Sequence, residues 1–524
     1  MQMWYKEPYK KLDYGLTRSL SSMSDASKNQ SPNIVFIIAE RARTDVYGCY
    51  GQQIKTSPVL DELAKRGVLF SQAFSACPES KLGAAILAKG RYYSLYDYQE
   101  APLIDTYLQQ AGYQCGHKGE FNGHYEPEML EHITDSAINF IENRDRSKPF
   151  YLTVSYPSFL QQDWSEPNPE MVTISYNEVD ISKWSDRVRD LFVKTKLPPD
   201  LLCLRGECFQ SYPPMLEHTY SIDSTMGRII DKLEELSLID NTVVIFSAIS
   251  GDHLRTRNRD VHCFRKDYYQ SSCHDNTLQV PLVIAGGPFK GGITDTNLVS
   301  TISIPSTILK LANVQETNPH LPGIDLSTTI AESEKRRIER EEYLKKHEEE
   351  YQKLYDETKK KAEEEGEEFV PPFKFDPDLE PLVEGSVFAQ LSSSRQARII
   401  RTAHYTYSAY VPANAEGKHY PRPIAYQDDL FYDNVTDPTQ VDNLIRDGFY
   451  KKIKLEMRQQ LQEYLTQNEG YTPDIIEAYP YVFDDEDEEE QDKDDKQDTA
   501  DSENKLRHSS EISEEELNQS ELQH

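Results

Sequence analysis

Apolar runs alternate with amphipathic segments through the first 330 residues of the chain. Residues 33–39 (NIVFIIA) form a continuous, β-branched apolar run, which is typical of a strand buried on both faces of a parallel sheet. The same reasoning predicts further strands at 68–74, 150–155, 241–248 and 279–285, and helices at 57–65, 103–111, 137–141, 221–236 and 303–312. This order predicts an α/β fold with a mostly parallel central sheet flanked by helices.

Charged residues follow two of the predicted strands directly. In such a fold, binding and catalytic groups gather where parallel strands end at their carboxyl side. Residues 40–45 follow the first strand, and residues 249–253 follow the strand at 241–248. These two segments are therefore the first candidates for a functional site.

The pattern changes after residue 331. Residues 332–368 contain good helix formers and charges of both signs, which predicts a solvent-exposed helix supported by ion pairs rather than a coiled coil. A proline-rich return ends near residue 381. Strand-like segments at 386–391 and 397–410 and a helix at 449–467 predict a smaller C-terminal α+β subdomain. The expected organisation is a polar arm (1–32), an α/β domain (33–331), a helical insertion with its return (332–381), the subdomain (382–471) and an acidic, disordered tail (472–524).

Composition narrows the class of protein. The 524 residues carry a formal net charge of −32, and residues 484–524 alone contain 18 acidic and 4 basic residues. Such a charge argues against binding of nucleic acid or of anionic lipid. No apolar run of membrane-spanning length occurs, the N-terminal residues lack the apolar stretch of a secretory signal, and the seven cysteines are scattered. We therefore expect no membrane insertion and a cytoplasmic location.

Several segments together resemble the sulfatase family of the alkaline phosphatase superfamily. Two of them are PNIVFIIAERARTDVYGCYG (32–51) and TSPVLDELAKRGVLFSQAFSACPES (56–80). The others are AGYQCGHKGEFN (111–122), KPFYLTVSYPS (148–158), MGRIIDKLEELSLIDNTVVIFS (226–247), RIIRTAHYTY (398–407) and FYDNVTDPTQVDNL (431–444). They occur in family order over most of residues 32–471, which implies the sulfatase fold.

The resemblance also implies a chemistry that can be checked residue by residue. Family sulfatases hydrolyse sulfate esters with a formylglycine, made from Cys or Ser in a C-x-P-x-R loop, and a Ca²⁺ ion. The two calcium-binding aspartates after the first strand correspond to Glu40 and Arg41. Glutamate is a tolerable ligand, whereas a guanidinium repels the ion. The nucleophile position corresponds to Ser80, but Leu82 and Ala84 replace the proline and arginine of the loop.

Other family positions also differ. Cys77 as the nucleophile would place Lys81 at the arginine position but would require an insertion. The G-K-W-H motif that contacts sulfate corresponds to residues 119–122 (GEFN), and the S-D-H-G motif corresponds without gaps to residues 248–251 (AISG). Asp252 and His253 restore the latter pair only if the loop bulges; otherwise they form a surface pair.

Two hypotheses follow from this resemblance. The first is a pseudoenzyme with a binding or scaffolding role and no cofactor, whose protein partner contacts residues 332–368 or the acidic tail. Arg41, Arg43 and Lys118 then either form a weak anion site or pair with Glu40, Asp45 and Glu120. The second is a divergent hydrolase of sulfate or phosphate esters, in which Ser80 is the nucleophile and Glu40, Asp252 and His253 hold a metal such as Ca²⁺.

Overall fold

Two β-sheets organise the chain in the computed structural model. The model describes residues 31–95, 97–121, 128–158, 197–204, 208–254, 272–314, 321–365, 369, 371–372, 385–392, 396–412 and 420–477. Both sheets belong to one compact unit, residues 1–445 and 449–476. The predicted N-terminal arm, the predicted proline-rich return and the acidic tail lie largely or wholly outside the described residues.

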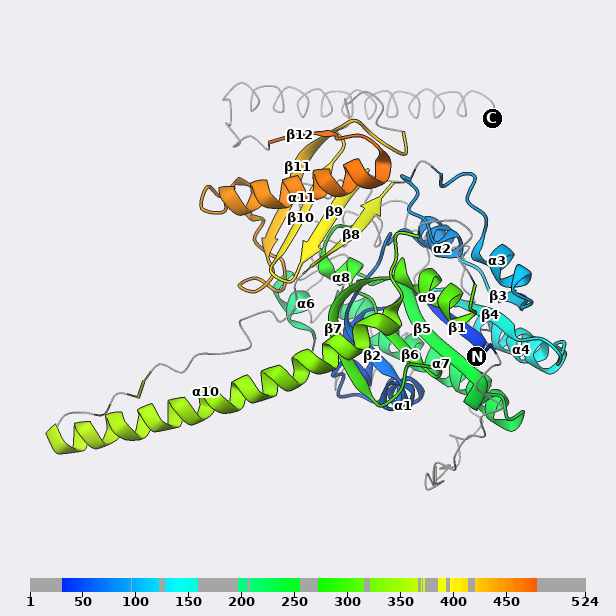
Figure 1. Cartoon of the computed structure of the whole chain (residues 1–524), viewed down its shortest axis with the longest axis horizontal. Helices are drawn as coiled ribbons and strands as arrows, with labels where there is room; N and C mark the ends of the chain where they lie inside the picture. Colours follow the sequence, from blue (N-terminus) through cyan, green and yellow to red (C-terminus); the bar gives the residue numbers. More distant parts are fainter. Residues whose placement is uncertain are drawn as a thin grey trace, which may run out of the picture. The chain divides into compact units, whose positions relative to one another are not determined.

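The larger sheet has seven strands in the order β3-β4-β1-β5-β6-β2-β7 (Figure 1). The strands are β1 (Asn33–Arg41), β2 (Val68–Phe74), β3 (Gln114–Lys118), β4 (Phe150–Tyr156), β5 (Thr242–Ser250), β6 (Leu282–Ala285) and β7 (Ile293–Ser300). Only β6 runs antiparallel to its neighbours, β5 and β2. The other adjacent strands pair in parallel, which confirms the predicted, mostly parallel sheet.

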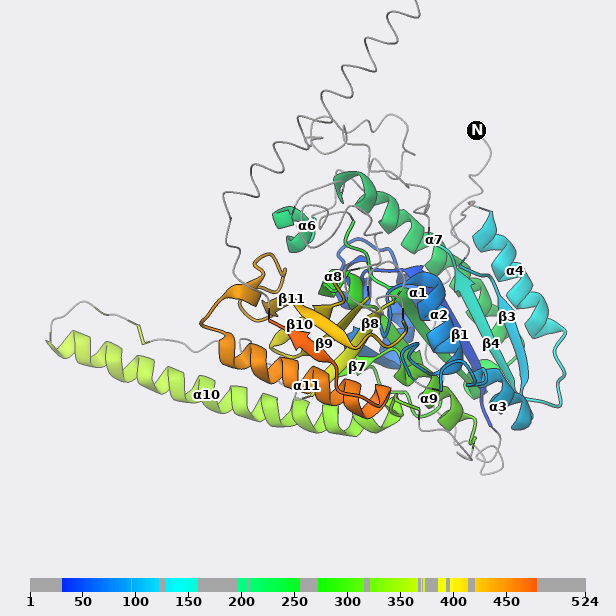
Figure 2. The same cartoon turned by 90° about the horizontal axis from the view of Figure 1, so that it is seen from above.

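Helices pack against both faces of this sheet (Figures 1 and 2). The helix α7 (Cys208–Glu235) contacts both α1 (Pro58–Arg66) and α4 (Met129–Glu142), and α2 (Ser80–Lys89), α3 (Ile104–Gln110) and α9 (Ser303–Leu311) contact one another. Side chains alternate between the faces of a strand, so Phe246 and Ile249 of β5 point to opposite faces. The two groups of helices thus form the outer layers of an α/β/α sandwich.

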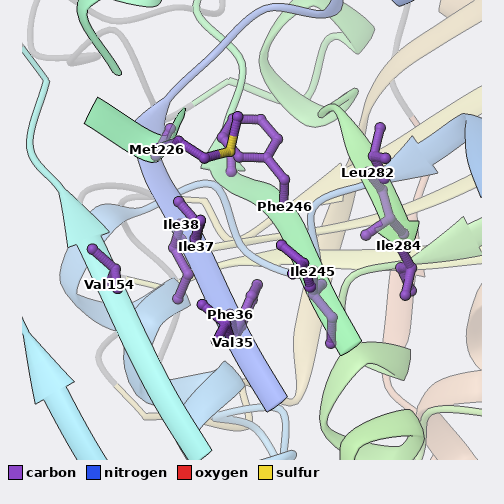
Figure 3. Packing of buried hydrophobic residues seen from close by; sticks show 14 of the residues in the cluster. Val35, Phe36, Ile37, Ile38, Val154, Met226, Ile245, Phe246, Leu282 and Ile284 are labelled. Atoms are coloured by element: carbon purple, nitrogen blue, oxygen red, sulfur yellow. The ribbon is translucent and has the colours of Figure 1, made fainter. Parts of the chain in front are cut away.

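The main hydrophobic core lies around β1 and β5, the two central strands. Every residue of both strands is buried, as expected for continuous apolar runs between two helical layers. Figure 3 shows this packing, with Phe36 and Ile38 on β1, Phe246 on β5 and Met226 from α7. The rigid pair of central strands fixes the position of whatever follows their carboxyl ends.

A buried carboxylate joins α7 to the first turn of α1. Asp223 is 2% exposed, and its Oδ2 and Oδ1 accept hydrogen bonds from the backbone N–H groups of Val59 and Leu60, each at 2.9 Å. These N–H groups have no acceptor within their own helix, so Asp223 caps α1 from a neighbouring helix. Burial raises the pKa of Asp223 to about 7, although the two hydrogen bonds oppose that shift.

This cap makes a testable contribution to the pH dependence of stability. Because the folded-state pKa of Asp223 is raised, its favourable contribution is complete below the unfolded pKa, near pH 4, and is lost as the pH rises through about 7. We expect the stability of wild type relative to Asp223→Asn to fall by about 3–4 kcal/mol between pH 4 and 8. Urea unfolding of both proteins across this range measures it, and a pH-independent difference would contradict the assignment.

Helix α10 (Thr329–Glu365) occupies the predicted helical insertion. Its first turns attach to β7: Thr329 Oγ1 donates a hydrogen bond of 2.5 Å to Asp295 Oδ2, and Ser333 Oγ accepts one from Thr296 N at 3.1 Å. Farther along, side chains of opposite charge pair three or four residues apart, as Arg337 does with Glu334 and Glu341. Ile338, Tyr343 and Leu354 are each more than 40% exposed, so this part of the helix presents apolar as well as charged groups to solvent.

The smaller sheet forms the predicted C-terminal α+β subdomain. Its strands are β8 (Ser386–Leu391), β9 (Ala397–Thr402), β10 (Tyr405–Tyr410), β11 (Ala425–Asp433) and β12 (Asp474–Ile476), and α11 (Lys451–Glu469) packs against β9 and β10 (Figure 2). The single strand predicted at 397–410 is in fact the hairpin β9–β10. None of the helices in the described ranges is long and apolar enough to cross a bilayer.

Candidate functional site

The carboxyl ends of β1 and β5 place four of the predicted site residues at one edge of the large sheet. Arg41 lies opposite Ser250 in the parallel register of the two strands, and Glu40 precedes it. Asp252 and His253 follow β5 within three residues. All four side chains are nearly inaccessible to solvent, with exposed fractions of 5% or less. Asp252 and His253 are therefore buried beside β1, and the surface pair allowed by the sequence is not formed.

An ion pair between Arg41 and Asp252 links the two strands. Arg41 Nη1 lies 3.7 Å from Asp252 Oδ2. The other carboxylate oxygen, Oδ1, accepts a hydrogen bond of 2.7 Å from the backbone N–H of Leu254, which fixes the carboxylate. Burial raises the pKa of Asp252 to about 6, while the positive charge of Arg41 opposes that shift. Near neutral pH the carboxylate is thus mostly ionised and faces a guanidinium.

Arg43 binds carboxylates of the protein. Its guanidinium donates hydrogen bonds to Asp45 Oδ2 at 2.6 Å, to Asp200 Oδ1 at 2.9 Å and to the backbone carbonyl of Asp252 at 2.8 Å. Burial acts to lower the pKa of Arg43, but the charges of Asp45 and Asp200 outweigh it and raise the pKa well above its ordinary value. The pairing with Asp45 agrees with the sequence-based alternative. Asp200, on α6 (Pro199–Leu204), was not predicted, since nothing in its local sequence points to Arg43.

Glu40 is held by the end of β4. Its Oε2 accepts a hydrogen bond of 2.8 Å from the backbone N–H of Ser158. Its Oε1 is buried and accepts no hydrogen bond from the residues that the structure describes. Such a buried carboxylate oxygen has a strong need for a positive partner.

Ser80, the predicted nucleophile position, is the first residue of α2 and is 4% exposed. The preceding loop meets the end of β5, because Ser75 Oγ donates a hydrogen bond of 2.5 Å to the carbonyl of Ile249. Gly83 allows α2 to approach closely: a Cβ there would lie 2.4 Å from the carbonyl oxygen of Cys77 and 2.7 Å from Ile249 Cγ2. The loop before Ser80 and the helix that Ser80 begins thus both contact the end of β5.

The C-terminal subdomain fixes the loop before Ser80. The backbone N–H of Gln390, on β8, donates a hydrogen bond of 3.0 Å to the carbonyl of Ala76. The N–H of Ser392 donates one of 2.8 Å to Glu79 Oε2, and the thiol of Cys77 lies 3.6 Å from the same oxygen. Burial and the nearby Glu79 raise the pKa of Cys77 well above its ordinary value, so this thiol stays protonated.

Lys118 does not join the two arginines. It ends β3, where it pairs in register with Val154, which in turn pairs with Ile37 on β1. Lys118 is therefore level with Ile37, which lies three residues before Glu40 on β1. Its ammonium group lies 5.8 Å from the centre of the Phe140 ring on α4. The structure thus brings Arg41 and Arg43 together and leaves Lys118 on a separate part of the sheet.

The residues at this edge do not fit the calcium ion that the sequence resemblance implies. Calcium prefers several convergent oxygen ligands of negative or neutral charge. Glu40 offers one open oxygen, but Arg41 brings a fixed positive charge against Asp252. Within the described ranges, no three His, Cys, Asp or Glu side chains converge as a ligand set. Whether Glu40, Asp252 and His253 bind any metal stays a prediction.

Comparison with known proteins places the chain in a family. The Sulfatase family profile matches residues 32–128 and 118–314, which together exceed half of the chain. An ulvan-active sulfatase of Formosa agariphila is 23% identical over 498 residues, covering 86% of this chain and 85% of the relative.

Solved structures agree on the fold. A putative sulfatase of Bacteroides thetaiotaomicron superposes with a TM-score of 0.55 at 20% identity, covering 84% of this chain and 93% of the other. A protein solved in complex with its substrate D-glucosamine-2-N,6-O-disulfate gives a TM-score of 0.56 at 17% identity, covering 85% and 99%. The family profile and the fold thus lead to the same conclusion: this chain belongs to the sulfatase family.

Proposed function

We propose that this chain is a sulfatase-family protein that does not hydrolyse sulfate esters and instead has a binding or scaffolding role. The observation that carries the proposal is the buried ion pair between Arg41 and Asp252. A guanidinium at the end of β1 repels any divalent cation that approaches the carboxylates at this edge. The charge stabilisation that a metal provides in ester hydrolysis is then lacking at this place.

The electrostatics around Arg43 support the same proposal. The anionic group of a sulfate ester is normally bound by arginine or lysine groups that have hydrogen bonds to spare. Arg43 already binds Asp45, Asp200 and the carbonyl of Asp252. Binding of an anion there requires breaking a partly buried ion pair, which leaves a carboxylate uncompensated. The edge therefore has little affinity for the substrate group of a sulfatase.

An assay of hydrolysis tests this proposal directly. The names of two relatives, an ulvan-active sulfatase and an N-acetylglucosamine-6-O-sulfatase of Bacteroides thetaiotaomicron, suggest sulfated carbohydrates as substrates beside an aryl sulfate and an aryl phosphate. We expect the purified full chain, with calcium or zinc present, to release no more sulfate or phosphate than its Ser80→Ala variant. Turnover of a sulfate ester by wild type would refute the proposal, and its loss in Ser80→Ala would identify Ser80 as the nucleophile.

One observation favours the second candidate function, a divergent metal-dependent hydrolase. Glu40 Oε1 is buried and lacks a hydrogen-bond donor among the described residues, as expected of a carboxylate oxygen that coordinates a metal. In this candidate, Ser80 attacks the ester, while Glu40, Asp252 and His253 hold the metal. The same assay decides between the two, because only the hydrolase loses turnover when Asp252 or Glu40 is replaced by alanine.

Helix α10 is the proposed contact for a protein partner. Its first turns are fixed to β7, and the exposed part beyond Arg340 carries Tyr343 and Leu354. Tyrosine is enriched among the residues that contribute most to protein interfaces, and Leu354 adds exposed apolar surface on the same helix. Proximity labelling in cells with the full chain and with Tyr343→Glu/Leu354→Glu tests this role. Identical labelled proteins for both chains would exclude the helix as the contact.

A further inference from the structure

We infer that Arg41 takes the place of a bound cation in this fold, and that replacing it with aspartate opens a divalent-cation site between β1 and β5. The inference deepens the proposed function of the same sheet edge and rests on it. The inference concerns which positive charge compensates the buried carboxylates, and not whether the protein cleaves an ester. Its test therefore measures cation-dependent stability, separately from turnover.

The first argument is the geometry of Asp252. Its Oδ1 is fixed by the backbone N–H of Leu254, whereas Oδ2 accepts no hydrogen bond from the described residues and faces Arg41 Nη1 at 3.7 Å. That distance lies beyond a hydrogen bond, so the guanidinium acts on this oxygen through its charge. Asp252 is fully buried, and its charge requires compensation from within the protein.

The second argument is independent and concerns Glu40. This carboxylate is 2% exposed and belongs to another position of the same edge. Its Oε2 is fixed by Ser158 N, and its Oε1 has no hydrogen-bond donor among the described residues. Glu40 and Asp252 are thus two buried carboxylates, each fixed through one oxygen and each with a second oxygen that accepts no hydrogen bond from the described residues, and carboxylate oxygens are the ligands that calcium and magnesium prefer.

The third argument is a balance of charge. Within the described part of the chain, Arg43 is the other arginine that acts on Asp252, and it is already paired with Asp45 and Asp200. Without Arg41, Asp252 loses the larger of the two arginine charges that act on its carboxylate. With Arg41→Asp, a carboxylate replaces the guanidinium that faces Asp252, and the two carboxylates repel each other unless a cation enters. The substitution thereby converts a cation-independent fold into a cation-dependent one.

Thermal unfolding of the full chain tests the inference, with millimolar CaCl₂ or MgCl₂ compared with EDTA. We expect calcium to leave the unfolding temperature of wild type unchanged, and to raise that of Arg41→Asp by about 5 °C or more. Calorimetric titration of Arg41→Asp with CaCl₂ should show one site, and Arg41→Lys, which keeps the positive charge, should behave as wild type.

A matched control distinguishes a site from general screening of charge. Arg401 is also buried and pairs with an aspartate, since its Nη2 lies 2.8 Å from Asp275 Oδ2. Arg401→Asp places the same charge change beside the same type of residue. Calcium should not raise its unfolding temperature beyond the small effect of ionic strength. Equal responses of Arg41→Asp and Arg401→Asp overturn the inference, and so does a wild type that calcium stabilises as strongly as Arg41→Asp.

A second variant covers the case in which Arg41→Asp does not fold. Arg41→Gln removes the charge with less repulsion and should show a smaller rise in unfolding temperature with calcium, whereas no rise at all contradicts the inference. The outcomes remain separate from the proposed function. Turnover of a sulfate ester by wild type refutes the proposed function even if calcium acts as expected, and a missing calcium response refutes the inference even if wild type is inactive.

Discussion

Replacing Arg398 with methionine is expected to lower the free energy of unfolding by about 3–5 kcal/mol. Arg398 is fully buried on β9, and its Nε lies 3.2 Å from Glu469 Oε1 at the end of α11. Its other nitrogens donate hydrogen bonds to the carbonyls of Leu391, Ala397 and Pro421. Without the guanidinium, the Glu469 carboxylate stays buried and uncompensated. Urea denaturation followed by circular dichroism measures the change.

Two controls isolate this effect. The double variant Arg398→Met/Glu469→Gln removes both charges and should recover a substantial part of the lost stability, because the cost comes from the remaining charge. Arg337→Met breaks ion pairs of the exposed helix α10 and should leave the unfolding midpoint unchanged. If Arg398→Met is no less stable than Arg337→Met, the buried pair contributes nothing.

Replacing Phe246 with alanine is expected to cost about 3–5 kcal/mol of stability. Phe246 is 1% exposed at the centre of the large sheet, and its ring meets the edge of the Tyr47 ring at a centroid distance of 5.5 Å. Met226 of α7 belongs to the same core, as Figure 3 shows. The substitution leaves a cavity between the sheet and α7. Thermal and urea unfolding should report the same loss.

Phe246→Leu is the matched control, since it keeps most of the apolar volume and should cost less than about 1.5 kcal/mol. A loss for Phe246→Ala that is no larger than for Phe246→Leu would show that the core collapses around the missing ring. Phe246 lies on β5, the strand that Asp252 follows, so the stability loss of both variants measures how much this strand's packing supports the structure around the site.

Much of the fold was predictable because buried parallel strands have a distinctive sequence pattern. The predicted strands at 68–74 and 386–391 coincide with β2 and β8, and the run at 33–39 lies within β1. The strand β7 (ITDTNLVS) was missed because it is half polar and lies at the edge of the sheet. The hairpin β9–β10 was read as one strand because its connection contains no Gly, Pro, Asn or Asp to indicate a turn.

The sequence predicts where the candidate site lies, but only some of the contacts between its side chains. The rule for carboxyl ends of parallel strands identified both segments that meet at the edge. The pairing of Arg41 with Asp252 was not predicted, because the two residues are 211 positions apart and the sequence offered Glu40 and Asp45 as nearer partners. Asp200 was missed for the same reason. Long-range ion pairs depend on how strands are ordered in the sheet, which local patterns do not determine.

The hydrogen bond between Ser392 N and Glu79 Oε2 has a consequence for how the protein is made. It joins residues 313 positions apart, and Gln390 N reaches Ala76 in the same way. At a synthesis rate of roughly 5–20 residues per second, the segment before α2 leaves the ribosome about 15–60 s before the strand that completes it. During that interval, the backbone N–H groups of Gln390 and Ser392 are not yet available to Ala76 and Glu79. The smaller sheet, which is synthesised later, therefore completes the contacts of the loop before α2, and termination of synthesis before β8 yields a nascent chain in which that loop lacks these backbone donors.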